Sequence, residues 1–430
     1  MKLELGGVKP QHYALGVLFS LYLAQGLPVG FMTQALPTLL RHYGVSLTHI
    51  GVSGLLMVPW AIKFLWAPYI DKYASAYLGH YRAWILLTQS LTVVCLVALA
   101  FVPITQMTSL SALWLLFILL LLLNLCCATQ DVATDGLAVK ILKQGQLHWG
   151  NTFQVMGSRF GFIVGGGAVL YAIDVLSWKM TFLLLTAGVL INSIPILYYR
   201  EPLKSSIQAS SNDAVLSWQE KLRQSYGYLW TNSELKLWLV VVVSFKLADG
   251  ISSPMLKPMM IDMGLSLSQI GIYVTMFGAA CALFGALCAG ALIRRFGLKA
   301  MLITFSGLQA ISFLYYIFLA YCFEKKVIVS AKHFYLANAI EEFFSAMALV
   351  AMLSLIMFYA RKKYAATDFS FQVAVMSMVS GGLYVLSGKL ADMLGYFVLL
   401  ICAFVLACLS ILPKIYWAYH SRLTTHQDNF

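Results

Sequence analysis

Long apolar stretches, separated by short polar segments, follow one another along the whole chain. Most are about 20 residues or longer, the length that an α-helix needs to cross a hydrocarbon core roughly 30 Å thick. Strands of a membrane barrel would be shorter and would alternate between apolar and polar positions. The pattern therefore predicts an all-α membrane protein. Its twelve expected transmembrane helices cover residues 12–39, 47–70, 83–104, 111–140, 150–173, 179–199, 235–261, 267–292, 299–323, 333–360, 366–391 and 396–418.

The composition agrees with a lipid environment. Hydrophobic residues make up 60% of the chain and charged residues 11%, whereas about a quarter of the residues of a soluble domain are charged. The net charge is +12, but the basic residues stand singly or in short groups at the ends of apolar stretches, so we expect no nucleic-acid binding. The eight cysteines lie within apolar stretches and lack metal-ligand spacing, so we expect packing roles for them and no metal or cofactor.

An even number of spans places both termini on one side of the membrane. If that side is the cytoplasm, the inner loops and tails hold 19 Lys and Arg residues and the outer loops hold six. Positive residues concentrate on the cytoplasmic side of membrane proteins. We therefore expect both termini in the cytoplasm.

The longest polar gap divides the spans six and six, and short motifs recur in the two halves. GVSLTHIG at residues 44–51 matches GLSLSQIG at 264–271, and FQV occurs at both 153–155 and 371–373. Two six-helix pseudo-repeats resemble the major facilitator superfamily, which works by alternating access. The expected domains are an N-terminal bundle at residues 1–200, a cytoplasmic linker with an amphipathic helix at 201–233, and a C-terminal bundle with a short tail at 234–430.

Two carboxylates in the fourth expected span are the strongest functional signal. Asp131 and Asp135 are four residues apart and so share one face of a helix. Ionisable groups inside a membrane are costly and mark substrate or proton pathways by default. Arg159 and Lys63 lie at a similar depth, and Arg159 can pair with Asp131 across adjacent helices. The group either exchanges protons as substrate moves or forms a fixed ion-pair lock for an inner gate.

Other polar positions within the spans are candidates for lining a substrate cavity. The first span is interrupted by glycines and prolines, and interrupted spans commonly line cavities. In the C-terminal half, Lys246 can pair with Glu341 or Glu342 near the middle of the membrane, either for substrate or only to stabilise the bundle. The cavity-lining candidates are Gln25, Gln34, Asn124, Gln130, Gln154, Lys246, Asp249, Glu341 and Glu342.

Charged residues after the second and eighth spans stand where a cytoplasmic gate motif is expected. They are Asp71 with Lys72, and Arg294 with Arg295. We expect Asp71 to accept hydrogen bonds from a facing helix N-terminus in one state and to release them in another. The alternative is an ordinary charged loop that only sets the topology.

Four motifs resemble the AmpG-like branch of the major facilitator superfamily. They are AQGLP at residues 24–28, KFLWAP at 63–68 with Asp71 after it, QDVATD at 130–135 and GNTFQ at 150–154. The branch includes AmpG permeases for anhydro-muropeptides, RhtX/FptX importers of ferric siderophores, and acetyl-CoA transporters. The resemblance implies import coupled to protons, with Asp131 and Asp135 as the branch's signature.

Residues 25–37 and 129–139 look closer to the siderophore importers. The sequence therefore predicts a monomeric, proton-coupled secondary transporter that imports a ferric siderophore, an anionic small molecule, across the bacterial inner membrane. The alternatives are an anhydro-muropeptide permease and an acetyl-CoA-type transporter.

Enzyme functions find no support in the sequence. A Gly-x-Gly-Asp context for an aspartyl protease is absent, and the histidines do not form the motif of a membrane acyltransferase. Channel function remains an alternative to carrier function. A channel, unlike a carrier, would show no counterflow exchange.

Overall fold

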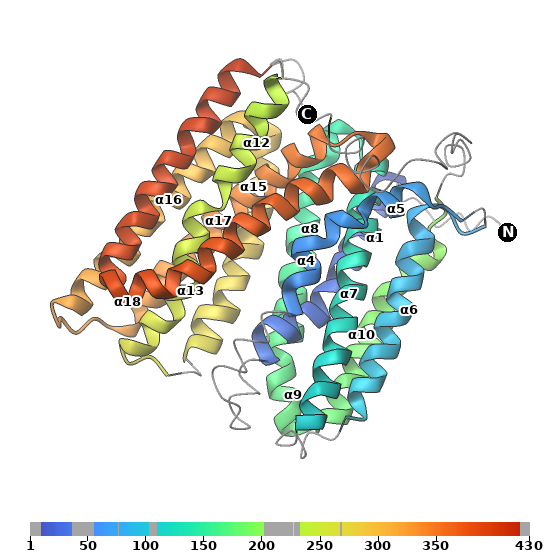
Figure 1. Ribbon diagram of the computed structural model, residues 1–430, viewed down its shortest axis with the longest axis horizontal. Helices are drawn as coiled ribbons and strands as arrows, with labels where there is room; N and C mark the ends of the chain where they lie inside the picture. The colour runs from blue at the N-terminus through green and yellow to red at the C-terminus, as the bar shows by residue number, and fades with distance from the viewer. Residues whose placement is uncertain are drawn as a thin grey trace. The chain divides into compact units, whose positions relative to one another are not determined.

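The computed structural model describes residues 10–36, 56–75, 77–102, 110–201, 227, 233–266 and 269–421. Apart from an isolated bridge between Ser75 and Gly79, these residues form helices and their connections (Figure 1). The predicted all-α fold is therefore confirmed. Nine described helical stretches are long and apolar enough to cross a membrane, as expected for a multi-pass membrane protein.

The helices of the first half follow the expected spans. Some spans are single helices, whereas others are built from shorter helical pieces in sequence. In chain order they are α1 (Pro10–Gly30) with the π-helical segment η1 (Phe31–Ala35); α4 (Val58–Ile62), the 3₁₀ turn η3 (Lys63–Leu65) and α5 (Ala67–Lys72); α6 (Tyr81–Ala100); α7 (Leu110–Ile141); the 3₁₀ turn η5 (Gln144–Gln146), α8 (Leu147–Phe162), the π-helical segment η6 (Ile163–Ala168) and α9 (Val169–Val175); and α10 (Trp178–Tyr198).

The described helices of the second half also follow the expected spans. The long helix α18 contains a break at Gly395, whose φ of +75° suits glycine, so α18 holds the last two expected spans. In chain order the elements are α12 (Ser233–Phe245) and α13 (Leu247–Asp262); the π-helical segment η10 (Ile270–Met276) with α15 (Phe277–Phe296); α16 (Leu298–Glu324); α17 (Ala331–Tyr359); and the 3₁₀ turn η11 (Lys362–Tyr364) with α18 (Ala365–His420).

Residue contacts divide the chain into two compact units. One comprises Met1–Val215 with Ala360–Thr367, and the other Leu216–Tyr359 with Asp368–Phe430. The start of α18 thus belongs with the first unit, which the sequence did not predict. The expected linker and amphipathic helix, residues 201–233, lie almost entirely outside the described residues.

Within the first unit, α1 packs against α7, α8 and α10, and α6 packs against α7 and α10 (Figure 1). Within the second, α15, α16 and α17 pack against one another. Side chains such as Leu120 and Phe182 are fully buried in the apolar core of the first unit, whereas Leu122 and Ile191 are exposed, as lipid-facing residues are.

Glycines allow α1 and α8 to approach backbone to backbone. Gly157, Gly161 and Gly165 recur every fourth residue on α8 and its continuation. A Cβ atom on Gly161 would lie 2.4 Å from the Gly26 Cα atom, and one on Gly165 would lie 1.9 Å from the Leu27 carbonyl oxygen. Such close approach through small residues holds membrane helices together.

Gly161→Ala should therefore destabilise the protein by about 1–3 kcal/mol, because the new methyl group forces α1 and α8 apart. Gly16→Ala is the matched control, since nothing lies within 4 Å of a Cβ atom there. Thermal unfolding of the purified protein in detergent should show a lower midpoint for the first variant only. Equal midpoints for both would contradict the packing described.

Candidate functional site

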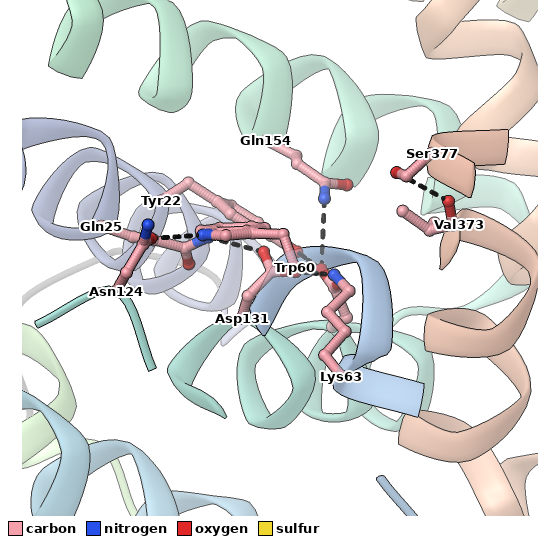
Figure 2. A network of polar contacts seen from close by, with 10 residues as sticks. Tyr22, Gln25, Trp60, Lys63, Asn124, Asp131, Gln154, Val373 and Ser377 are labelled. Carbon is pink, nitrogen blue, oxygen red and sulfur yellow. Dashed lines mark hydrogen bonds and ion pairs between the residues drawn. The ribbon is translucent and has the colours of Figure 1, made fainter. Parts of the chain in front are cut away.

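Asp131 on α7 is buried, with 5% of its surface exposed, and both of its carboxylate oxygens have partners. Its Oδ2 atom forms an ion pair with the Lys63 ammonium group, and its Oδ1 atom accepts a 2.6 Å hydrogen bond from Gln25 Nε2 (Figure 2). Lys63 is also buried, with 1% exposed. A buried ion pair of this kind is tolerated because each charge neutralises the other.

Asp135 lies on the same face of α7 but is held differently. Its Oδ1 atom accepts hydrogen bonds from Tyr22 Oη at 2.8 Å and from Gln154 Nε2 at 3.1 Å. Among the described residues, no group donates to its Oδ2 atom and no cation forms an ion pair with it. Burying an ionised carboxylate without a cation costs far more than burying the neutral acid. The two carboxyl groups of α7 therefore differ in their surroundings.

A second layer of contacts orients Lys63. Trp60 Nε1 donates a 2.6 Å hydrogen bond to Asn124 Oδ1 (Figure 2). Asn124 Nδ2 in turn donates to the Leu56 carbonyl oxygen. The Lys63 ammonium group lies 5.2 Å from the centre of the Trp60 ring, a cation–π distance. Asn124 therefore fixes the helix that carries Lys63 instead of facing an open cavity.

Prolines explain why this helix is interrupted. Pro59 occupies the first turn of α4 and Pro68 the first turn of α5. Proline has no N–H group and is favoured in a first helical turn, so each proline starts a new helical segment. Lys63 falls in the 3₁₀ turn between the two segments and is directed at Asp131.

The partner expected for Asp131 differs from the one found. The sequence suggested Arg159, whereas the ion pair in the structure is with Lys63. Arg159 is half-buried on α8.

Two other cavity-lining candidates of the first half also lie against neighbouring helices. Gln130 is buried, and its Nε2 atom lies 3.5 Å from the Leu21 carbonyl oxygen. Gln34 is half-buried beside Gly166.

The structure shows a partner for Lys246 other than the predicted Glu341 or Glu342, whose pairing with Lys246 stays a prediction. The Lys246 ammonium group pairs with Asp249, three residues further along the chain. Glu341 is buried and Glu342 half-buried on α17. Lys246 is the residue that precedes α13, and Asp249 lies in the first turn of that helix.

Three polar residues of the structure, Tyr22, Gln309 and Lys414, were not predicted from the sequence. Tyr22 stands three residues before Gln25 and hence on the same face of α1, a spacing that could have revealed it. Gln309 Nε2 donates a 2.9 Å hydrogen bond to Asp249 Oδ1. Lys414 is buried in α18, with 2% of its surface exposed.

Asp71 makes the hydrogen bonds expected of a gate residue. Its carboxylate accepts from the backbone N–H groups of Ala366 at 3.1 Å and Thr367 at 2.7 Å, in the first turn of α18, and from Tyr81 Oη. Burial raises the pKa of the Asp71 carboxyl group, and the hydrogen bonds from Thr367 and Tyr81 oppose that rise. A carboxylate at a helix N-terminus also interacts favourably with the helix dipole.

The other predicted gate residues are at the surface. Lys72 is exposed at the end of α5, and Arg294 and Arg295 are exposed in the last turn of α15. Their role in gating stays a prediction.

The helix that carries the two carboxylates touches the Asp71 contact directly. Gly136 follows Asp135, and a Cβ atom on Gly136 would lie 2.6 Å from a ring carbon of Tyr81 and 2.8 Å from the Ala366 Cβ atom. Tyr81 in turn donates its hydroxyl hydrogen bond to Asp71. A displacement of α7 would therefore move Tyr81 or the start of α18.

Comparisons with known proteins agree with this architecture. Residues 14–171 match the family model described as "Acetyl-coenzyme A transporter 1", and residues 239–426 match that of the Major Facilitator Superfamily. The human organic anion transporter TETRAN has a similar fold, with a TM-score of 0.73 over 95% of this chain and 100% of that one at 13% identity. FucP in its outward conformation gives a TM-score of 0.67 over 95% and 99% at 14% identity.

Two curated relatives match over most of their length. The anhydromuropeptide permease of Escherichia coli K12 is 26% identical over 376 residues, which cover 86% of this chain and 72% of the permease. A Rickettsia felis protein that bears the AmpG name is 24% identical over 394 residues, which cover 89% of this chain and 91% of that protein.

These relatives are transporters, not enzymes, which favours a secondary transporter of a small molecule. The second half of the chain is similar to the major facilitator superfamily, and most of the chain is similar to transporters of the AmpG-like branch.

A double-mutant cycle tests the ion pair of Lys63 and Asp131. Lys63→Met and Asp131→Asn should each lower the free energy of unfolding by about 3–5 kcal/mol, because each leaves a buried polar group without its partner. The double variant should lose clearly less than the sum of the two. Thermal unfolding in detergent measures all four proteins, and simple additivity would show that the two residues do not interact.

Proposed function

We propose that the protein imports an anhydro-muropeptide together with protons across the bacterial inner membrane, with both termini in the cytoplasm. The carboxylates of α7 support the coupling, and the similarity to the anhydromuropeptide permease supports the substrate. The expectation of ferric-siderophore import rested on two short motifs. The similarity over most of the chain favours the muropeptide alternative, so the siderophore becomes the competing substrate in the test.

The main support for this proposal is that Asp131 and Asp135 have different partners. Asp131 keeps Lys63 as its counterion, whereas Asp135 has two hydrogen-bond donors and an unpartnered oxygen. A proton that enters from outside binds Asp135 and removes a buried negative charge. When the proton leaves to the cytoplasm, the Tyr22 and Gln154 donors stabilise the carboxylate that remains.

Movement of the gate follows from the contact between α7 and Tyr81. In the state described by the structure, Asp71 holds the first turn of α18. Charging or neutralising Asp135 shifts α7 at Gly136, and Tyr81 transmits that shift to Asp71. The start of α18 is then released, which allows the alternating access of this superfamily.

A second candidate substrate comes from the family model that matches the first unit, which is described as an acetyl-coenzyme A transporter. Acetyl-CoA therefore enters the test as a third compound.

Uptake into proteoliposomes under an inward proton gradient tests the proposal. Labelled anhydro-muropeptide should accumulate, and an uncoupler should abolish that accumulation. Accumulation of a ferric siderophore or of acetyl-CoA in its place would reject the proposed substrate while leaving the transporter class intact.

Asp135→Asn separates coupling from binding. This variant should lose accumulation driven by the proton gradient by at least tenfold, yet it should retain exchange of internal for external substrate, because exchange needs no proton release. Asp392→Asn, at an exposed position, is the matched control and should behave as wild type. Full proton-driven accumulation by Asp135→Asn would show that Asp135 carries no coupled proton.

A further inference from the structure

The second unit contains a charged cluster that the coupling mechanism does not use. It begins where the seventh expected span is interrupted, at Lys246 between α12 and α13. The backbone of Lys246 leaves the helical range, with φ of −103° and ψ of +12°, and α13 starts at the next residue. In transporters, the N-termini of such broken helices commonly face anionic groups of the substrate.

A second, deeply buried lysine lies beside this break. Lys414 on α18 is 2% exposed, and its ammonium group donates a 3.2 Å hydrogen bond to Ser410 Oγ. Among the described residues, no carboxylate forms an ion pair with it. The ammonium groups of Lys414 and Lys246 lie 5.2 and 5.4 Å from the centre of the same Phe245 ring. The ring therefore brings the two cations into one cluster.

The cluster contains more positive than negative charge. Asp249 pairs with Lys246, accepts a 2.9 Å hydrogen bond from Gln309, and interacts electrostatically with Lys414. Two ammonium groups thus share one carboxylate. Buried charges require counterions. One further anion would bring the net charge of the cluster to zero.

The two lysines differ in their access to a ligand. The side chain of Lys246 is 23% exposed, whereas only 2% of Lys414 is exposed. An anion that binds Lys246 competes with Asp249 for that ammonium group. Lys414 can then neutralise Asp249, so that no carboxylate in the cluster loses its counterion.

We propose that Lys246 and Lys414 form an anion-binding subsite for a carboxylate group of the transported molecule. Lys246 contacts the carboxylate, and Lys414 replaces Lys246 as the partner of Asp249. The subsite rests on the proposed function only in that the carboxylate belongs to the transported compound. Muropeptides and carboxylate siderophores both offer such a group, so the subsite sets the chemical class of the ligand and not its identity.

The test uses a minimal carboxylate that does not depend on the identity of the substrate. The purified full-length chain is titrated with N-acetylalanine and with N-acetylalanine amide, and the midpoint of thermal unfolding is followed. The acid should bind wild type roughly tenfold more tightly than the amide, because only the acid supplies the missing negative charge. Lys246→Met and Lys414→Met should lose this preference.

Two further variants keep the test decisive. Lys414→Arg retains the cation and should keep the preference for the acid, even if Lys414→Met does not fold. Lys389→Met removes an exposed lysine and should match wild type. Equal binding of acid and amide by wild type, or an undiminished preference in Lys414→Met, would overturn the subsite.

The same titration with an anhydro-muropeptide and with its amidated form separates the two claims. If wild type prefers N-acetylalanine over its amide but neither binds nor transports the muropeptide, the proposed substrate is rejected and the subsite stands. If the muropeptide is transported but Lys414→Met still prefers its acid form, the subsite is rejected and the proposed function stands.

Discussion

The cost of burying charge in a membrane protein governs the arrangement of the first unit. The ion pair of Asp131 with Lys63 lowers that cost for one carboxylate of α7, whereas among the described residues no cation forms an ion pair with the other, Asp135. Two acids one helical turn apart thus acquire different chemistry from their surroundings. The same requirement for a counterion explains the proposed anion subsite at Lys246 and Lys414.

Helix packing makes these contacts possible. The glycines of α8 admit the backbone of α1 at a distance that larger residues would forbid. This places Gln25 against Asp131 and Tyr22 against Asp135. Since α7 also contacts Tyr81 through Gly136, one helix joins the carboxylates to the hydrogen bonds at the start of α18. The helix packing, the buried carboxylates and the hydrogen bonds of Asp71 therefore belong to a single connected group of helices.

Much of the fold could be predicted from the sequence because hydrophobic length and helical periodicity act locally. The same periodicity placed Asp131 and Asp135 on one face, and an Asp after the second span indicated the contact with a helix N-terminus. Ion-pair partners could not be predicted reliably. Depth along a helix sets the level of Arg159 and Lys63 but not the direction in which each side chain points. The prolines at positions 59 and 68 decide that direction for Lys63.

Lys414 illustrates a second reason why the polar residues could not all be predicted from the sequence. A lysine near the end of an apolar stretch is typical of the membrane boundary, and only the packing of the second unit shows that it is buried. The pairing of Lys246 with Asp249 likewise depends on the interruption between α12 and α13, which the apolar pattern does not reveal.

The central claim is that Asp135, and not Asp131, changes its protonation during transport. Infrared difference spectroscopy on the reconstituted protein, with and without substrate, measures the C=O stretch of protonated carboxyl groups directly. We expect a substrate-dependent change in that band, which disappears in Asp135→Asn and persists in Asp131→Asn. A change that persists in Asp135→Asn and disappears in Asp131→Asn would contradict the claim.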